Sequence, residues 1–244
     1  MTFNSDPVDW KDLQEKVRQV FLEIGCFAET GKKIETVRGE VEIDVYVKDA
    51  TKIPEMIYLC ECKYWDSTIP QSVIHSFQTV ASNYGAHLGY IISKKGFQRG
   101  AYNATRNSNV QLLTWNQFQE MYFDTWKSAM FEKLSQSAEP FSKYYDYLNG
   151  PLFPQDTKDQ IECQRLRKKY NLLFEFTPNY LKIFSEHLKV PKNCIDPRGD
   201  KNEMNEIIIT NYRELFDIFI EARDSGIEAF ENFRRFLKSK HNSD

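Results

Sequence analysis

The sequence of 244 residues lacks the features of several large protein classes. It contains no run of the roughly 20 apolar residues that a membrane-spanning helix requires. Residues 1–7 have neither a basic start nor an apolar core, so we expect no secretion signal. The five cysteines are odd in number and lack C-x-x-C spacing, which favours a reducing compartment over a disulfide framework. We therefore expect a cytoplasmic protein.

Several motifs are also missing. No Gly-x-Gly-x-x-Gly, phosphate-loop or Gly-x-Ser-x-Gly pattern is present, so nucleotide-driven translocation and serine hydrolase chemistry have no support. There is no excess of basic residues, because 32 lysines and arginines face 35 acidic residues for a net charge of −3. Binding of phosphates must therefore depend on local patches or on a partner, and we expect the free chain to bind generic duplex DNA weakly.

What the sequence does contain is enough apolar material for a real core, with 41% hydrophobic and 14% aromatic residues. An opening helix capped by Asp6 and ended by Gly25 is predicted, because six apolar side chains recur on one helical face: Trp10, Leu13, Val17, Val20, Phe21 and Ile24. The patterns that follow predict, in order, strands over 26–36, 41–47 and 58–64, a helix over 70–83, a strand over 88–93, a helix over 96–107 and a strand over 110–114. This order predicts an α/β core with a mixed sheet.

The composition changes in the second half of the chain. Prolines, glycine and tyrosines gather in a turn-rich stretch, and beyond it only helical patterns remain, clearest over 202–223 and 226–238. We therefore expect a catalytic domain over 1–136, a connector over 137–155 and an all-α domain over 156–244. No motif indicates the role of this last domain.

The most informative stretch is 58–64, an apolar run that contains Glu61 and Lys63. Alternate side chains of a strand share a face, so these two charged groups point the same way. Removing a carboxylate and an ammonium from water is costly unless something compensates. The strand over 41–47 offers a second acid, Asp44. Two acids and a lysine on one sheet face indicate a metal-dependent nuclease centre.

The spacing of an acid and a lysine separated by one residue is weak evidence by itself. The chain has three such triplets, which begin at Asp9, Glu61 and Asp156. The first opens an amphipathic helix and the third lies in a polar loop. Only Glu61 sits in a buried strand that follows an acidic strand, so the context supports the interpretation.

Hydrolysis of a phosphodiester requires an activated water and neutralisation of negative charge. Mg²⁺ does much of this and prefers oxygen ligands, so Asp44, Glu61 and the Cys62 backbone carbonyl are the expected ligands, with Mn²⁺ as a substitute. Lys63 is expected to orient the attacking water or to stabilise the transition state. Its charge also offsets the repulsion between two close carboxylates.

The arrangement resembles the PD-(D/E)XK nuclease superfamily, and most closely its Mrr-like restriction endonuclease branch, over roughly residues 8–123. Six segments carry the resemblance in order: Ile24-Gly25-Cys26, Gly39-x-x-x-Ile43-Asp44-Val45, Cys60-Glu61-Cys62-Lys63-Tyr64-Trp65, Gly89-Tyr90-Ile91-Ile92-Ser93, Gly96-Phe97-Gln98-Arg99-Gly100-Ala101 and Val110-Gln111-Leu112-Leu113-Thr114. The resemblance implies a restriction-endonuclease-like fold that cuts double-stranded DNA, often foreign DNA in bacterial defence.

By the same resemblance, Asp44 is the metal-binding acid, Glu61 the second ligand and Lys63 the catalytic lysine. Many relatives carry an acid on the opening helix where this chain has Gln14, which puts a fourth carboxylate in doubt. Relatives commonly end the last strand with an Asp-Gly turn, whereas this chain has Thr114-Trp115. A single site hydrolyses one strand, so cutting both strands favours a homodimer or a partner defence protein recruited through the helical domain.

Other readings of these residues stay open. Asp44, Glu61 and Lys63 could form a structural ion-pair network, and the fold could be a catalytically silent module that docks DNA or a partner. The same chemistry also permits cleavage of RNA or of DNA junctions. Glu42 and Gln78 are secondary candidates, as an assisting acid and as a contact to a metal-bound water or a phosphate. Three basic residues after a predicted strand could hold backbone phosphates: Lys94, Lys95 and Arg99.

Overall fold

The computed structural model describes residues 3–138, 140, 144, 154, 156–171, 193–196 and 205–241. The chain divides into two compact units, residues 1–129 and 130–244, and the boundary falls within helix α4, Trp115–Ala138. Most of the connector predicted over 137–155 lies outside the described residues. None of the described helices is both long enough and apolar enough to cross a membrane.

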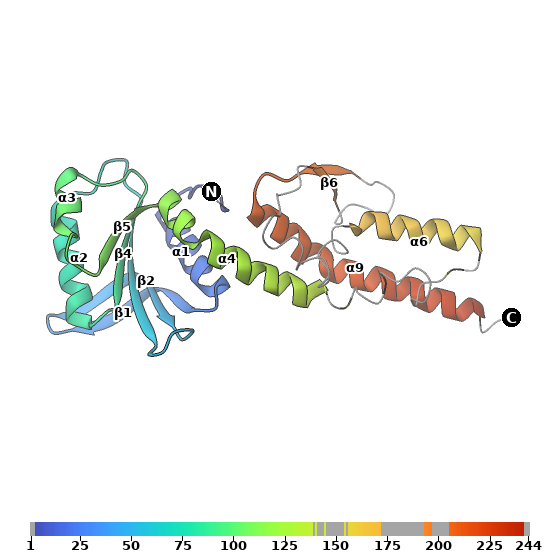
Figure 1. The fold of residues 1–244 in the computed structure, drawn as a ribbon, viewed down its shortest axis with the longest axis horizontal. Helices are drawn as coiled ribbons and strands as arrows, with labels where there is room; N and C mark the ends of the chain where they lie inside the picture. Colours follow the sequence, from blue (N-terminus) through green and yellow to red (C-terminus); the bar gives the residue numbers. More distant parts are fainter. Residues whose placement is uncertain are drawn as a thin grey trace. The chain divides into compact units, whose positions relative to one another are not determined.

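The first unit is built on a sheet of five strands in the order β1-β2-β3-β4-β5 (Figure 1). The strands are β1 Phe27–Thr36, β2 Gly39–Asp49, β3 Met56–Lys63, β4 Leu88–Ser93 and β5 Val110–Thr114. The pairs β1/β2 and β2/β3 are antiparallel, whereas β3/β4 and β4/β5 are parallel. The predicted α/β core with a mixed sheet is confirmed.

Helices cover both faces of this sheet. Helices α2 Gln71–Tyr84 and α3 Arg99–Ala104 lie on one face, and α1 Trp10–Glu23 and α4 lie on the other (Figure 1). On the α2 face, Phe77 and Ile74 pack with Leu59 of β3 in one buried cluster. On the α1 face, the Phe21 ring contacts the ring of Tyr58, at 6.1 Å between centroids. Alternate residues of β3 therefore enter two separate cores.

Two details of the opening helix differ from the prediction. Asp9, rather than Asp6, is the N-cap, and its carboxylate accepts a hydrogen bond from the Asp12 N–H at 2.8 Å. Leu13, Val17, Val20 and Phe21 of the predicted face are buried, whereas Ile24 is half-buried and Trp10 is 53% exposed. Trp10 is the first residue of the helix, so it lies at the end of the apolar stripe.

Gly89 of β4 shows how closely α2 approaches the sheet. A Cβ atom at this position would lie 2.8 Å from Cε1 of Phe77 and 3.0 Å from Cγ2 of Val110. Only a residue without a side chain lets Phe77 reach the sheet here. The helix predicted over 96–107 is shorter in the structure, where α3 begins at Arg99.

The second unit contains the predicted helices together with a short antiparallel sheet. Its described elements are the end of α4, then α6 Thr157–Lys169, β6 Asn193–Ile195, β7 Glu206–Ile208 and α9 Tyr212–His241. The two helices predicted over 202–223 and 226–238 form one continuous helix that starts ten residues later. A single Gly226 costs the helix only about 1 kcal/mol. Buried Phe219 and Phe230 continue its apolar face on either side.

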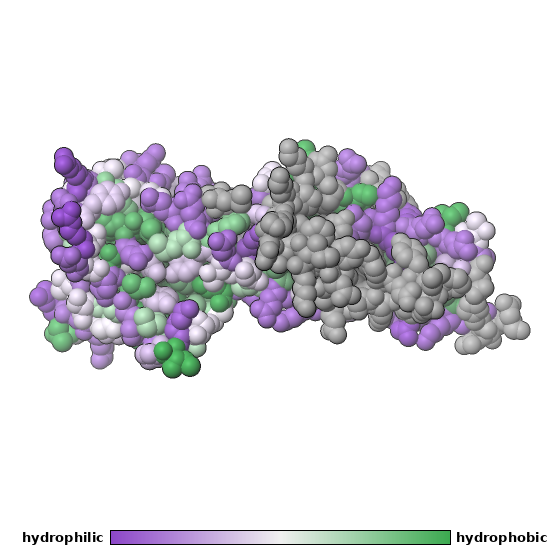
Figure 2. All heavy atoms as spheres, in the orientation of Figure 1, coloured by the Kyte–Doolittle hydropathy of each residue, from purple (hydrophilic) through white to green (hydrophobic). Residues whose placement is uncertain are grey.

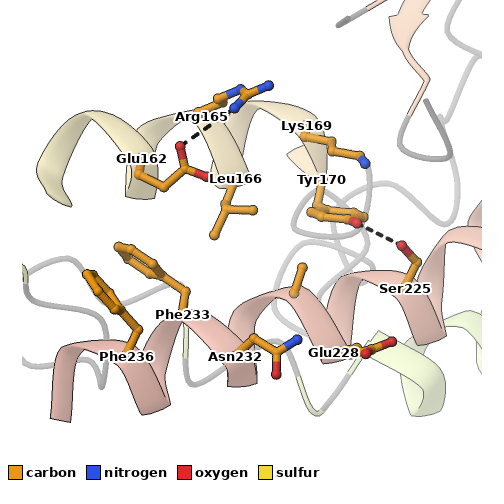
Figure 3. Close-up of a pocket in the computed structure, with 11 residues that line it drawn as sticks. Glu162, Arg165, Leu166, Lys169, Tyr170, Ser225, Glu228, Asn232, Phe233 and Phe236 are labelled. Atoms are coloured by element: carbon orange, nitrogen blue, oxygen red, sulfur yellow. Dashed lines mark hydrogen bonds and ion pairs between the residues drawn. The ribbon is translucent and has the colours of Figure 1, made fainter. Parts of the chain in front are cut away.

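Helices α6 and α9 of this unit face one another across a pocket of about 460 Å³ (Figure 3). Tyr170, the C-cap of α6, shares a hydrogen bond of 2.9 Å with Ser225 of α9. Leu166 and Phe233 are among the residues that line the pocket. The surface in view in Figure 2 shows hydrophobic side chains interspersed among hydrophilic ones in the described parts.

Candidate active site

Asp44 lies at the point where β2 separates from β3. Backbone pairing of the two strands runs from Asp49 with Met56 to Val45 with Cys60 and stops there. Beyond it, the Cys62 N–H donates to Oδ2 of Asp44 at 2.7 Å. A side-chain carboxylate thus satisfies a backbone donor that a paired strand would have satisfied. The geometry fixes the Asp44 carboxylate directly beside the Glu61-Cys62-Lys63 triplet.

Gln14 of α1 holds the other oxygen of the same carboxylate. Its Nε2 donates to Oδ1 of Asp44 at 2.8 Å, so each oxygen of Asp44 accepts one hydrogen bond within the protein. Gln14 is half-buried, and its neighbour Leu13 is fully buried against the sheet. The structure therefore brings Gln14 to the predicted centre as a partner of Asp44.

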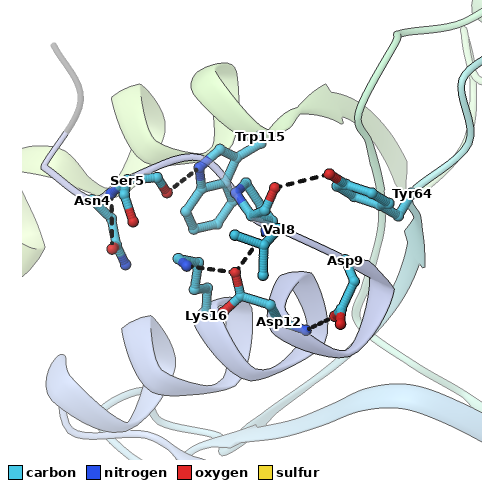
Figure 4. Close-up of polar contacts among 9 residues, drawn as sticks. Asn4, Ser5, Val8, Asp9, Asp12, Lys16, Tyr64 and Trp115 are labelled. Atoms are coloured by element: carbon cyan, nitrogen blue, oxygen red, sulfur yellow. Dashed lines mark hydrogen bonds and ion pairs between the residues drawn. The ribbon is translucent and has the colours of Figure 1, made fainter.

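The segment before α1 is tied to the end of β3. The Tyr64 hydroxyl donates to the Pro7 carbonyl at 3.0 Å, and the indole N–H of Trp115 donates to the Ser5 carbonyl at 3.2 Å (Figure 4). Asp12 accepts from the Val8 N–H at 2.8 Å and pairs with Lys16 at 2.6 Å (Figure 4). These contacts connect the start of α1, and hence Gln14 one turn later, to the strand that carries the triplet.

Glu61 and Lys63 lie on one side of β3, as the alternation predicts. Lys63 Nζ contacts Oε1 of Glu61. The Lys63 side chain is 19% exposed and the Glu61 side chain is 22% exposed. Both residues line a pocket of about 430 Å³ against α2. The intervening Cys62 side chain and that of Cys60 are buried, and burial raises the pKa of both thiols. Neutral, enclosed thiols are packing groups.

Burial raises the pKa of Asp44 to about 6, and the nearby negative charge of Glu61 adds to this increase. The Cys62 N–H and the Lys63 charge act in the opposite direction, without cancelling it. At neutral pH the carboxylate is therefore ionised at a cost in free energy. A cation bound between Asp44 and Glu61 would remove that cost.

The donor set fits a magnesium site with few protein ligands. Within the described residues, no group of three or more acidic, histidine or cysteine side chains gathers to hold a metal. Mg²⁺ commonly takes only one or two carboxylates and completes its shell with water and substrate oxygens. Asp44 and Glu61, whose charges interact, offer such a pair of carboxylates.

The two secondary candidates occupy different places. Glu42 is exposed at the rim of the pocket, and its negative charge is a minor cause of the raised pKa of Asp44. Gln78 donates from Nε2 to the Ala104 carbonyl at 2.9 Å, so its amide joins α2 to α3. Gln78 is not among the residues that line the pocket.

Two residues near the triplet have roles that the sequence analysis did not assign. Trp65 lines the pocket, and alternation through 61 and 63 could have indicated this position. Lys94, a predicted phosphate contact, has its Nζ 2.6 Å from Oδ1 of Asp66 and 4.1 Å from the ring centroid of Tyr64. The Lys94 N–H donates to the Lys63 carbonyl at 3.0 Å, which places it beside the triplet.

Residues 5–122 match the Mrr_cat family, described as restriction endonuclease. The crystal structure of AF1548, a protein of unknown function, is similar at 17% identity with a TM-score of 0.39, and the match covers 44% of this chain and 59% of that chain. No curated protein matches the chain.

Proposed function

We propose, from the match of residues 5–122 to the Mrr_cat restriction endonuclease family, that the chain is a metal-dependent endonuclease that hydrolyses phosphodiester bonds of DNA. The observation that supports activity is that Asp44 of β2 lies beside Glu61 and Lys63 at the end of β3. The Asp44 carboxylate is held there by the Cys62 N–H at 2.7 Å. A silent docking module has no need of this costly arrangement of buried charges.

Each residue has a distinct task in this proposal. Asp44, Glu61 and the Cys62 carbonyl would hold Mg²⁺, or Mn²⁺ in its place, and the ion would supply Lewis-acid stabilisation of the negative charge that develops. Gln14 and the Cys62 N–H orient the Asp44 carboxylate through its two oxygens. The Lys63 ammonium donates a hydrogen bond to the attacking water or to an oxygen of the scissile phosphate as negative charge develops there.

We further propose a role in bacterial defence against foreign DNA, which would place the enzyme in the cytoplasm. Duplex cleavage requires two cuts, so a homodimer or a partner protein engaged through the second unit would supply the second site. The acidic balance of the chain, with a net charge of −3, supports the need for such a partner or for a special substrate, because generic phosphate binding is weak.

The test is incubation of the purified chain with plasmid, linear duplex DNA and RNA in the presence of Mg²⁺ or Mn²⁺. Asp44→Ala and Lys63→Ala are expected to lower the cleavage rate by roughly 10²- to 10⁴-fold. Lys33→Ala is the matched control, because its exposed ammonium pairs with Glu40 on the β1–β2 hairpin. Equal cleavage by the wild type and both variants would refute this centre.

If the wild type cleaves none of the three substrates, the silent docking module becomes the better interpretation. Binding of the same nucleic acids by Asp44→Ala, measured without cleavage, then distinguishes docking of DNA from docking of a protein partner. Cleavage of RNA alone would replace DNA as the substrate while keeping the same residues.

A further inference from the structure

The pocket beside the triplet has more space than the proposed chemistry uses. Its volume of about 430 Å³ lies within the range of small-molecule binding sites. Glu61 and Lys63 occupy one part of its lining, and the remaining wall is largely apolar and comes from β2 and α2: Val41, Ile43, Val73, Phe77 and Val80. The pocket is therefore continuous with the catalytic centre but chemically different from it.

Trp65 forms another part of the lining, next to Lys63. Its side chain is 43% exposed, and Lys63 Nζ lies 5.9 Å from the centroid of its ring. An indole that lines a pocket with much of its surface free is a platform on which a flat aromatic group can stack. Such a platform adjoins the lysine that is proposed to act on the scissile phosphate.

The charges of the pocket argue against a phosphate as its occupant. Lys63 is the only basic residue of the lining and contacts Glu61, while Glu42 adds a negative charge, so the rest of the lining offers no cation to a phosphate. A neutral aromatic group avoids this repulsion and gains from the apolar wall. Ser72 and Ser76 contribute hydroxyls to the lining, and Glu42 a carboxylate, which are groups that hydrogen-bond base edges.

We propose that this pocket receives an unpaired nucleobase of the DNA substrate, stacked on Trp65, so that the enzyme acts beside an unpaired nucleotide. This inference rests on the proposed nuclease function and names its substrate class. Removing a base from a duplex costs a few kcal/mol, and the cost is least where the base has no partner. A chain with a net charge of −3 gains in this way an affinity that phosphate contacts do not supply.

The cleavage test uses two end-labelled duplexes of one sequence, one fully paired and one with a single-nucleotide bulge. Stacking of one base on an aromatic side chain predicts that the wild type cleaves beside the bulge roughly 5- to 150-fold faster. Trp65→Ala should bring this rate ratio close to one, whereas Trp65→Phe should retain most of it. Tyr102→Ala is the matched control, because Tyr102 is 52% exposed on α3 and is not part of the pocket lining.

A binding test separates this proposal from the nuclease proposal. Asp44→Asn lowers activity without altering the pocket lining, so its affinity for the two duplexes can be measured by fluorescence anisotropy. We expect tighter binding of the bulged duplex, and loss of the difference on adding Trp65→Ala or the pocket-filling Ser76→Leu. Equal affinity for both duplexes overturns the base pocket. Preferred binding of the bulged duplex without any cleavage by the wild type contradicts only the nuclease activity.

Discussion

Replacing Asp44 by asparagine tests the electrostatic description of the site without disturbing its shape. Asparagine is nearly isosteric, its amide oxygen can accept from the Cys62 N–H, and Gln14 can rotate its amide to accept from the new NH₂ group. The substitution therefore keeps both hydrogen bonds of 2.7 and 2.8 Å and removes only the charge. We expect the variant to lose catalytic activity and to be more stable than the wild type at neutral pH.

The magnitude follows from the pKa of Asp44. Burial and the charge of Glu61 raise it from 3.8 to about 6, so the folded protein binds a proton that the unfolded chain has already released. Stability due to this group therefore falls as pH rises through the interval from about 4 to about 6. The cost of ionising Asp44 in the folded state is small near pH 4 and reaches roughly 3 kcal/mol at pH 7.5.

The assay is urea unfolding in EDTA at several pH values, followed by tryptophan fluorescence. All four tryptophans lie within residues 1–129, so the signal reports the first unit. The stability advantage of Asp44→Asn should grow by roughly 2 kcal/mol between pH 4 and pH 7.5, whatever its value at pH 4. Adding Mg²⁺ should stabilise the wild type and leave the variant almost unchanged.

Asp66→Asn provides a control for which the expected pH dependence of stability has the opposite sign. The Lys94 hydrogen bond lowers the pKa of this exposed acid, so its contribution to stability is present above its unfolded pKa and is lost at low pH. Asp66→Asn should therefore show no advantage that grows with pH. A stability difference between Asp44→Asn and the wild type that does not change with pH would refute the electrostatic reasoning.

Two further predictions concern the partner of Asp44 and the assembly of the enzyme. Gln14→Glu replaces a donor at 2.8 Å from Asp44 with a third carboxylate, so it should destabilise the protein by roughly 1–3 kcal/mol in EDTA and bind Mg²⁺ more tightly. Gln14→Met is the control, because it removes the donor without adding charge. Equal melting temperatures of Gln14→Glu and the wild type in EDTA would contradict the prediction. If a dimer makes both cuts, the rate of duplex cleavage per protomer should rise with enzyme concentration, and a constant rate per protomer would count against a required dimer.

Much of the first unit could be predicted because its signals are local. The buried strand over 88–93 and the strand over 110–114 are short runs with clear ends, and the structure confirms both as strands. The sequence predicts Asp6 as the cap of α1, whereas Asp9 is the cap, because both acids precede the same apolar face. The sequence also predicts a break before Gly226, but α9 is continuous there, because packing of the surrounding apolar face outweighs a local preference of about 1 kcal/mol.

The site shows a sharper division between what sequence can and cannot predict. Alternation along 58–64 was enough to place Glu61 and Lys63 on one face, because side-chain direction in a strand follows from the backbone. The contact of Gln14 with Asp44 spans 30 residues and depends on how α1 packs against the sheet. The Lys94 contacts depend in the same way on the parallel pairing of β3 with β4.

The position of Asp44 follows from the way in which β2 separates from β3. Where β2 stops pairing with β3, the Cys62 N–H needs an acceptor, and a carboxylate from the separating strand supplies it. The same separation leaves room for a pocket beside Glu61 and Lys63. Continued pairing of β2 with β3 would satisfy the Cys62 N–H at a lower electrostatic cost. The raised pKa of Asp44 reflects the free energy that is lost because a carboxylate takes this place instead. A cation bound between Asp44 and Glu61 would recover that free energy, which links metal binding to the stability of the first unit.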